Sequence, residues 1–162
     1  MFSDRLQYAS VELENLDAFH SLIQDDHVRR YLLDGNLFPR EWSEERLRES
    51  QSLFERRGVG LWLARDNTKE LVGFCGFLEF PSIHPEPQLV YAMRERFTGK
   101  GYATEMARAA LAQARRRTGF ARVFASVDAV NVASYRVLEK LGFEPVATQR
   151  GSFGNMYLLR LG

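Results

Sequence analysis

The sequence predicts an α/β fold with a mixed β-sheet. Two observations lead to this expectation: segments with the composition of short strands recur from residue 59 onwards, and segments with the periodicity of helices interrupt them. The chain has 162 residues, of which 45% are hydrophobic, and this is enough for one domain with its own core. We therefore expect residues 1–162 to form a single domain without a linker.

The segment before residue 59 is predicted to be mainly helical after a short strand at residues 6–9. A first amphipathic helix is indicated by apolar residues near helical spacing, which are Leu13, Leu16, Phe19 and Ile23. Residues 25–33 fit a second short helix that stops before Gly35. Ser43 is predicted to cap a clearer helix that ends at Gly58.

The middle of the chain has the pattern of strands. Residues 61–64 and 71–78 are apolar and flank a turn at residues 66–69, so they predict a β-hairpin. A proline-rich link over residues 81–87 leads into another strand at residues 88–93. These segments supply three of the expected strands.

The C-terminal part returns to alternating helices and strands. Residues 102–117 are rich in alanine and form the strongest predicted helix. A strand at residues 121–127 and a helix at residues 131–141 follow it. The last two strands are predicted at residues 143–149 and 155–161.

The charge balance argues against a large charged binding surface. With 22 basic and 21 acidic residues the net charge is +1, so we expect neither nucleic acid nor a membrane as a partner. Cys75 stands alone and is expected in the core, and His27 and His84 lack partners at metal-ligand spacing, so no metal site is expected. No secretory signal is apparent, and no apolar run reaches the roughly 18 to 20 residues that span a bilayer. A cytoplasmic location is expected.

The junction at residues 98–104 is the most informative stretch of the chain. It reads Thr98-Gly99-Lys100-Gly101-Tyr102-Ala103-Thr104 and leads directly into the longest predicted helix. The start of a helix has unpaired backbone NH groups and a partial positive charge, and glycines allow an anion to approach closely. Lys100 adds a cation. The segment therefore predicts a pyrophosphate site, although glycines before a helix are also ordinary turn residues. It matches neither the Walker loop nor the full dinucleotide-binding pattern.

A second motif follows about thirty residues later in the printed sequence, as Asn131-Val132-Ala133-Ser134 and the ending Leu141-Gly142-Phe143. Together the two motifs resemble the GNAT N-acetyltransferase superfamily, and within it the branch that includes ribosomal-protein N-terminal alanine acetyltransferases. Residues 99–105 match the Gly-Lys-Gly-Tyr-Ala-Thr-Glu run of that branch without a change. The resemblance is strongest over residues 88–143.

The resemblance implies a mixed, mostly antiparallel central sheet of six to seven strands flanked by about four helices. It implies an acetyl-CoA-dependent N-acetyltransferase in which a primary amine attacks the thioester directly. Acetyl-CoA would be the cosubstrate, no metal would be needed, and a homodimer is a possible assembly.

The resemblance also assigns the residues that bind coenzyme A. In the family pattern Gln/Arg-x-x-Gly-x-Gly/Ala, Thr98 replaces the first residue, which matters little if backbone NH groups bind the pyrophosphate. The strand that ends at Met93 should splay from its neighbour and bind the pantetheine arm, together with Asn131. The implied set is Met93, Thr98, Gly99, Lys100, Gly101, Tyr102, Ala103, Thr104, Asn131 and Ser134. Arg136 and Lys140, at i, i+4 spacing, are either contacts of the 3′-phosphate or solvated surface cations.

Ser134 is the candidate proton donor, or hydrogen-bond partner, for the departing thiolate. Its alternative role is that of a first-turn serine bonded to the backbone. Leu138 stands where many relatives carry an acidic tyrosine, and Tyr135 is no clean replacement because adjacent helical side chains diverge by about 100°. Ser126 stands where some relatives carry a glutamate base.

The general base is therefore sought among Glu79, Glu86 and Asp128, which follow or precede strands where an amine could approach. Each of these carboxylates is also a candidate solvated loop residue. The alternative to an enzyme is a non-catalytic acyl-CoA-binding sensor of the same fold, and a second alternative is a nucleotide-phosphate binder of another fold.

The acceptor is left open between a protein or peptide N-terminal amine and a small-molecule amine. One set of charges would attract a cationic amine, and it comprises Asp25, Asp26 and Glu55. The opposite set would hold an acidic group, and it comprises Arg29, Arg30 and Arg150. His27 is a candidate lining residue of the acceptor pocket.

Overall fold

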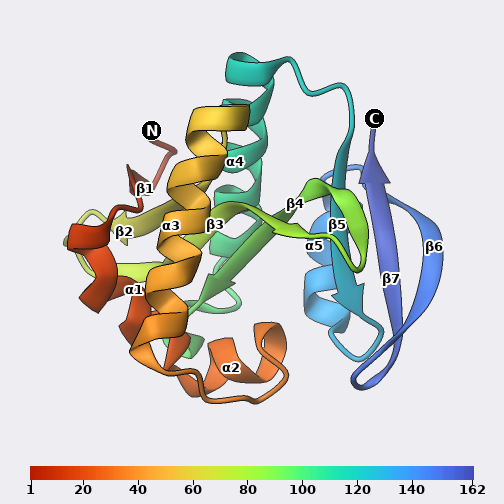
Figure 1. The fold of residues 1–162 in the computed structure, drawn as a ribbon, viewed down its shortest axis with the longest axis horizontal. Helices are drawn as coiled ribbons and strands as arrows, with labels where there is room; N and C mark the ends of the chain where they lie inside the picture. The colour runs from red at the N-terminus through yellow and green to blue at the C-terminus, as the bar shows by residue number, and fades with distance from the viewer.

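The computed structural model describes residues 1–162 as a seven-stranded sheet covered by helices on both faces (Figure 1). The strand order is β1-β2-β3-β4-β5-β7-β6. The bounds of the strands are β1 Leu6–Ser10, β2 Leu61–Asp66, β3 Leu71–Phe80, β4 His84–Met93, β5 Val123–Asp128, β6 Glu144–Gly151 and β7 Gly154–Leu161. Neighbouring strands are antiparallel except for β4 and β5, which are parallel. The predicted mixed, mostly antiparallel sheet is confirmed.

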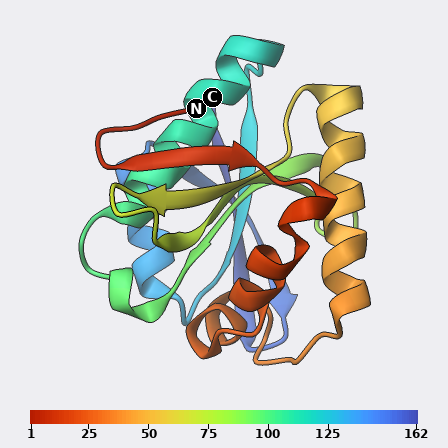
Figure 2. The same ribbon diagram turned by 90° about the vertical axis from the view of Figure 1, so that its left-hand side faces the viewer.

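Five α-helices complete the fold. They are α1 Leu16–Ile23, α2 Asp26–Leu32, α3 Arg40–Arg57, α4 Tyr102–Thr118 and α5 Val132–Lys140, with short 3-10 turns η1 Leu13–Asn15 and η2 Glu95–Phe97. One core cluster joins the sheet to α4 and α5, and a second joins it to α1, α2 and α3. Figure 2 shows α3 and α4 on opposite sides of the sheet. None of the helices combines the length and apolar character needed to cross a bilayer.

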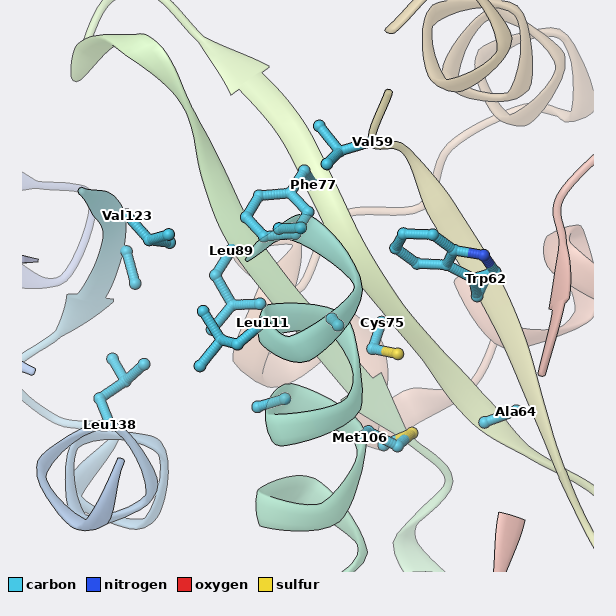
Figure 3. Close-up of a cluster of buried hydrophobic side chains, with 14 of the residues drawn as sticks. Val59, Trp62, Ala64, Cys75, Phe77, Leu89, Met106, Leu111, Val123 and Leu138 are labelled. Atoms are coloured by element: carbon cyan, nitrogen blue, oxygen red, sulfur yellow. The ribbon is translucent and has the colours of Figure 1, made fainter. Parts of the chain in front are cut away.

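The two faces of the sheet follow from the period of two along each strand. In β4, Leu89 and Met93 belong to the cluster beneath α4, whereas Val90 and Ala92 belong to the cluster beneath α1 to α3. Figure 3 shows side chains of α4, including Met106 and Leu111, among those of the central strands. Cys75 lies in this cluster, where burial raises the pKa of its thiol.

Two predicted boundaries are wrong. Helix α3 begins at Arg40 with Pro39 as its N-cap residue, and Ser43 is buried inside the helix, where its Oγ lies 2.7 Å from Nδ1 of His20. The proline-rich link is also shorter than predicted, because β4 begins at His84. The prolines at 85 and 87 are tolerated because they lie in an irregular part of the β3–β4 ladder and have no partner in β5.

The position of the site is set by the divergence of β4 and β5. These strands share a single pairing, Gln88 with Phe124. Beyond it they separate, so the C-terminal half of β4 has one edge without a partner strand. This agrees with the splay that the family resemblance implies at Met93. The two strands are parallel because the chain crosses from β4 to β5 through α4.

Candidate active site

A cleft of about 1320 Å³ occupies the gap between the diverging strands. Residues 89–93 form one wall and residues 125–128 the other. The starts of α4 and α5 line the cleft from one face of the sheet, and α2 with the β6–β7 turn line it from the other. We name the part of the cleft at the start of α4 the donor end, after the acyl donor that the family resemblance implies, and the part beside α2 and the β6–β7 turn the opposite end.

The donor end is built around the start of α4. Gly99 and Gly101 have φ angles of 73° and 83°, in the left-handed region that glycine adopts without strain. Gly101 is the N-cap residue and supplies no side-chain cap, and the first backbone bond of the helix runs from the NH of Glu105 to the oxygen of Gly101. The NH groups of the first turn are thus available to an anion.

Most of the predicted loop residues lie on the cleft wall. Those that do so are Thr98, Gly99, Gly101, Tyr102, Ala103 and Thr104, and Met93 lines the cleft at the end of β4. Lys100 is the exception: it is exposed, outside the wall, with its ammonium 5.7 Å from the centre of the Phe97 ring. Of the two cations predicted near the 3′-phosphate, Lys140 lines the cleft and Arg136 does not.

Asn131 and Ser134 meet at the start of α5. The Oδ1 atom of Asn131 accepts a hydrogen bond from the NH of Ser134 at 3.1 Å, so Asn131 caps the helix. Because its oxygen is used in this way, the Nδ2 group is the part of Asn131 that remains for a ligand.

Ser134 has a partner that the sequence did not suggest. The hydroxyl of Tyr91, on β4, lies 2.8 Å from Ser134 Oγ and 3.2 Å from the Ser134 carbonyl oxygen. Burial raises the pKa of Tyr91 to about 12, although the hydrogen bond to Ser134 opposes this shift. A phenol therefore lies beside Ser134 even though position 138 is a buried leucine. Tyr135 packs against Tyr157 with ring centres 5.6 Å apart, as a core aromatic.

The three predicted base candidates are separated by the fold. Asp128, at the end of β5, lines the cleft. Glu86 pairs with Arg57 at 3.5 Å and Glu79 with Arg56 at 3.1 Å, and neither lines the cleft. Glu86 lies near the start of β4, where it contacts Arg57 of α3. The geometry therefore gives Glu86 no access to a reacting group.

Asp34 is a residue that sequence analysis missed. It follows α2 with a φ of 56°, lines the cleft, and accepts a 2.7 Å hydrogen bond from Ser152 Oγ in the β6–β7 turn. Desolvation by burial raises the pKa of Asp128, and the negative charge of Asp34 raises it further. Two carboxylates from distant parts of the chain thus share the end of the cleft opposite α4.

Few of the predicted acceptor residues reach this end. His27 and Arg150 line the cleft. Asp25 caps α2 through His27 and Val28, and Asp26 pairs with Arg29. Arg29, Arg30 and Glu55 lie off the cleft wall, and Glu55 borders a separate hollow beside β1 and α3. His84 stacks on Phe124 with ring centres 3.7 Å apart.

Comparison with known proteins identifies the family. A family model for the acetyltransferase (GNAT) domain matches residues 5–144. The chain belongs to this family. It is 27% identical over 143 residues, 88% of this chain and 81% of the relative, to the uncharacterized N-acetyltransferase YoaA of Bacillus subtilis.

Two solved structures share the fold at low identity. A ribosomal L7/L12 alpha-N-protein acetyltransferase in complex with coenzyme A has a TM-score of 0.81 at 17% identity, covering 98% of this chain and 94% of that chain. The spermidine N-acetyltransferase of Vibrio cholerae, in complex with coenzyme A and spermine, has a TM-score of 0.79 at 16% identity, covering 98% and 96%.

Proposed function

We propose that this protein transfers an acetyl group from acetyl-CoA to a primary amine. The observation that supports this most is the arrangement of the cleft. At one end it has an uncapped helix start behind two left-handed glycines, and a free strand edge forms one wall. Two carboxylates line the other end. A thioester carbonyl bound between these ends would be open to attack by an amine.

The donor end suits coenzyme A part by part. The NH groups at the start of α4 would bind the pyrophosphate, since a helix N-terminus favours an anion. The pantetheine arm carries amide groups, and the edge of β4 beyond Gln88 has backbone donors and acceptors that no strand pairs. Asn131 would add a side-chain donor. Tight binding needs no metal in this scheme.

The departing thiolate needs a hydrogen-bond donor more than a full proton. A thiol has an ordinary pKa near 8.5, and the phenol of Tyr91, with a pKa of about 12, stays protonated at neutral pH. Tyr91 has one hydrogen, and it can donate to Ser134 Oγ while Ser134 donates its own hydrogen to the sulfur. We therefore assign Ser134 as the donor to the thiolate and Tyr91 as the residue that orients it.

The amine must lose a proton to act as a nucleophile. Of the two carboxylates that line the cleft, Asp34 accepts a hydrogen bond from Ser152, and we assign Asp128 as the base. Its raised pKa brings it closer to the range in which a carboxylate accepts a proton well. Asp34 and Asp128 together attract the ammonium form of the acceptor. A peptide N-terminus and a small-molecule amine both satisfy this chemistry, and the two solved relatives described above are named for one acceptor of each kind.

The first test is release of free thiol from acetyl-CoA in the presence of amines. The panel contains spermidine, single amino acids and short peptides with a free N-terminus, and we expect turnover with at least one. The paired measurement is the affinity for coenzyme A, ATP and NAD. Binding of coenzyme A without turnover on any amine would favour the sensor, and equal affinity for ATP or NAD would favour a general nucleotide-phosphate binder.

Substitution of Gly99 by alanine should weaken coenzyme A binding by about 10-fold, because a left-handed φ costs an ordinary residue about 1–2 kcal/mol and the loop must distort. Gly119→Ala is the matched control. It has a φ of 63° at the other end of α4, and neither position has an atom within 4 Å of an added Cβ. Both variants should melt at lower temperature, and only Gly99→Ala should bind coenzyme A less tightly in calorimetry. Equal coenzyme A affinities of Gly99→Ala and Gly119→Ala would show that the loop does not bind coenzyme A.

Substitution of Asp128 by asparagine should lower kcat by about 100-fold if it is the base. In the native enzyme kcat/KM should fall as the pH falls through the pKa of Asp128. The variant Asp34→Asn removes the charge that raises this pKa, so the acid limb should move to lower pH. Glu86→Gln is the control, because Glu86 lies outside the cleft. An acid limb that moves with Glu86→Gln and not with Asp34→Asn would contradict the assignment.

Substitution of Tyr91 by phenylalanine should lower kcat by about 10-fold and leave the KM for acetyl-CoA nearly unchanged, since a hydrogen bond made in the transition state is lost. Ser134→Ala should lose at least as much. The double variant should be no slower than Ser134→Ala alone, because the two hydroxyls act as one unit. Tyr135→Phe is the control for loss of a phenol from the core. Additive losses of kcat in the double variant would show that Tyr91 does not act through Ser134.

A further inference from the structure

The N-terminal segment is tied to the first turn of α4 through Glu105. The Glu105 carboxylate accepts hydrogen bonds from Ser3 Oγ at 2.6 Å, from the NH of Arg5 at 2.8 Å and from Arg5 Nε at 2.8 Å. The guanidinium also forms an ion pair with it at 2.7 Å. Figure 2 shows the N-terminus beside α4. Two guanidinium nitrogens contact Oε2, and Ser3 and the NH of Arg5 contact Oε1, so each carboxylate oxygen accepts charge-assisted or short hydrogen bonds.

The same guanidinium contacts Lys100 and Tyr102 and lies beside Gly101, all three in the loop at residues 98–104 that we call the anion loop. Arg5 Nη1 donates to the carbonyl oxygen of Lys100 at 2.8 Å. Its Cζ lies 4.3 Å from the centre of the Tyr102 ring, in a cation–π contact. Its Nη2 lies 3.5 Å from the position that a Cβ on Gly101 would take. Arg5 thus holds the loop from outside the cleft, and it is not part of the cleft wall.

This loop needs an external restraint. Glycines at 99 and 101 leave the intervening peptides free to rotate, because glycine has access to both signs of φ. A rotated peptide would turn a carbonyl oxygen, instead of an NH group, toward a bound phosphate. The bond from Arg5 to the Lys100 oxygen fixes that carbonyl on the outer side of the loop.

The negative charge of Glu105 is a second reason why the loop needs Arg5. Glu105 lies in the first turn of α4, where its negative charge stabilises the helix but repels a pyrophosphate. Burial opposes ionisation of Glu105, yet the hydrogen bonds from Ser3 and Arg5 outweigh it, so its pKa lies below the usual value. The carboxylate is therefore ionised at neutral pH, and the positive charge of Arg5 offsets it beside the anion site.

We propose that Arg5 is a positioning residue for the pyrophosphate of coenzyme A, acting through the Lys100 carbonyl and Glu105 and not through contact with the cofactor. This inference rests on the proposed function. It predicts that Arg5 matters for donors that carry the pyrophosphate and not for donors that lack it.

The test compares Arg5→Ala with the unmodified full chain on three ligands. Coenzyme A and 3′-dephospho-coenzyme A both contain the pyrophosphate, and pantetheine does not. We expect Arg5→Ala to bind the first two about 10-fold less tightly by calorimetry, equivalent to about 1.4 kcal/mol. Its binding of pantetheine, followed by NMR titration, should match that of the unmodified chain. With saturating acetyl-CoA, kcat should stay within about 2-fold, because uniform binding is lost and not transition-state stabilisation.

Two further variants guard against a general loss of folding. Arg5→Lys retains the charge but cannot bridge Glu105 and the Lys100 oxygen with one planar group. Its affinity for coenzyme A should therefore lie between those of Arg5→Ala and the unmodified chain. Arg108→Ala removes an exposed cation from the same helix, outside these contacts, and should bind coenzyme A normally. Melting curves for each variant report folding separately.

Each contrary outcome has a distinct meaning. Equal affinity of Arg5→Ala and the unmodified chain for coenzyme A would overturn the inference and leave the proposed function intact. A deficit with coenzyme A that disappears with 3′-dephospho-coenzyme A would show direct contact with the 3′-phosphate and overturn the positioning role. An equal deficit on pantetheine would show general damage to the cleft. Failure of the unmodified chain to bind coenzyme A would overturn the proposed function itself.

Discussion

The architecture depends on one constraint, which is that β4 and β5 pair at Gln88 and Phe124 and nowhere else. If the ladder continued, the walls of the cleft would close and the edge of β4 would have no free backbone groups. Because the strands diverge, the helices that follow them on one face, α4 and α5, present their N-termini to the same gap. The divergence of the two strands thus places around one cleft the loop at residues 98–101, Asn131, Ser134 and Asp128.

The part of the site that the sequence could predict is the part that is local. Two glycines before a long helix predict a left-handed turn and an uncapped helix start, which the structure shows, and the Asn131–Ser134 spacing belongs to one helix start. The fold class followed from strand and helix periodicity for the same reason. The error in the predicted start of α3 is also local, because Pro39 and not Ser43 is the N-cap residue.

The site residues that the sequence did not predict are joined by contacts between distant parts of the chain. Tyr91 and Ser134 are 43 positions apart, Arg5 and Glu105 are 100 apart, and Asp34 meets Ser152 across 118 positions. A tyrosine in an apolar strand has the pattern of a core residue, and nothing local distinguishes Asp128 from Glu86. Only the tertiary fold separates a carboxylate in the cleft from one that pairs with Arg57.

The contacts of Arg5 join the loop at residues 98–101 to the first few residues of the chain. Ser3 and Arg5 bond to Glu105, and the carbonyl of Met1 accepts a bond from the NH of Tyr8, so this segment has a defined path. Met1 borders the hollow that Gln113 and Arg117 of α4 also line, so a purification tag fused ahead of Met1 emerges beside the later turns of α4 and not beside the loop at residues 98–101. Joined after Gly162, at the end of β7, the same tag starts from a strand that packs against β5 and β6. If Arg5 acts as proposed, an N-terminal tag changes donor affinity only when it disturbs the path of residues 3–5 along α4.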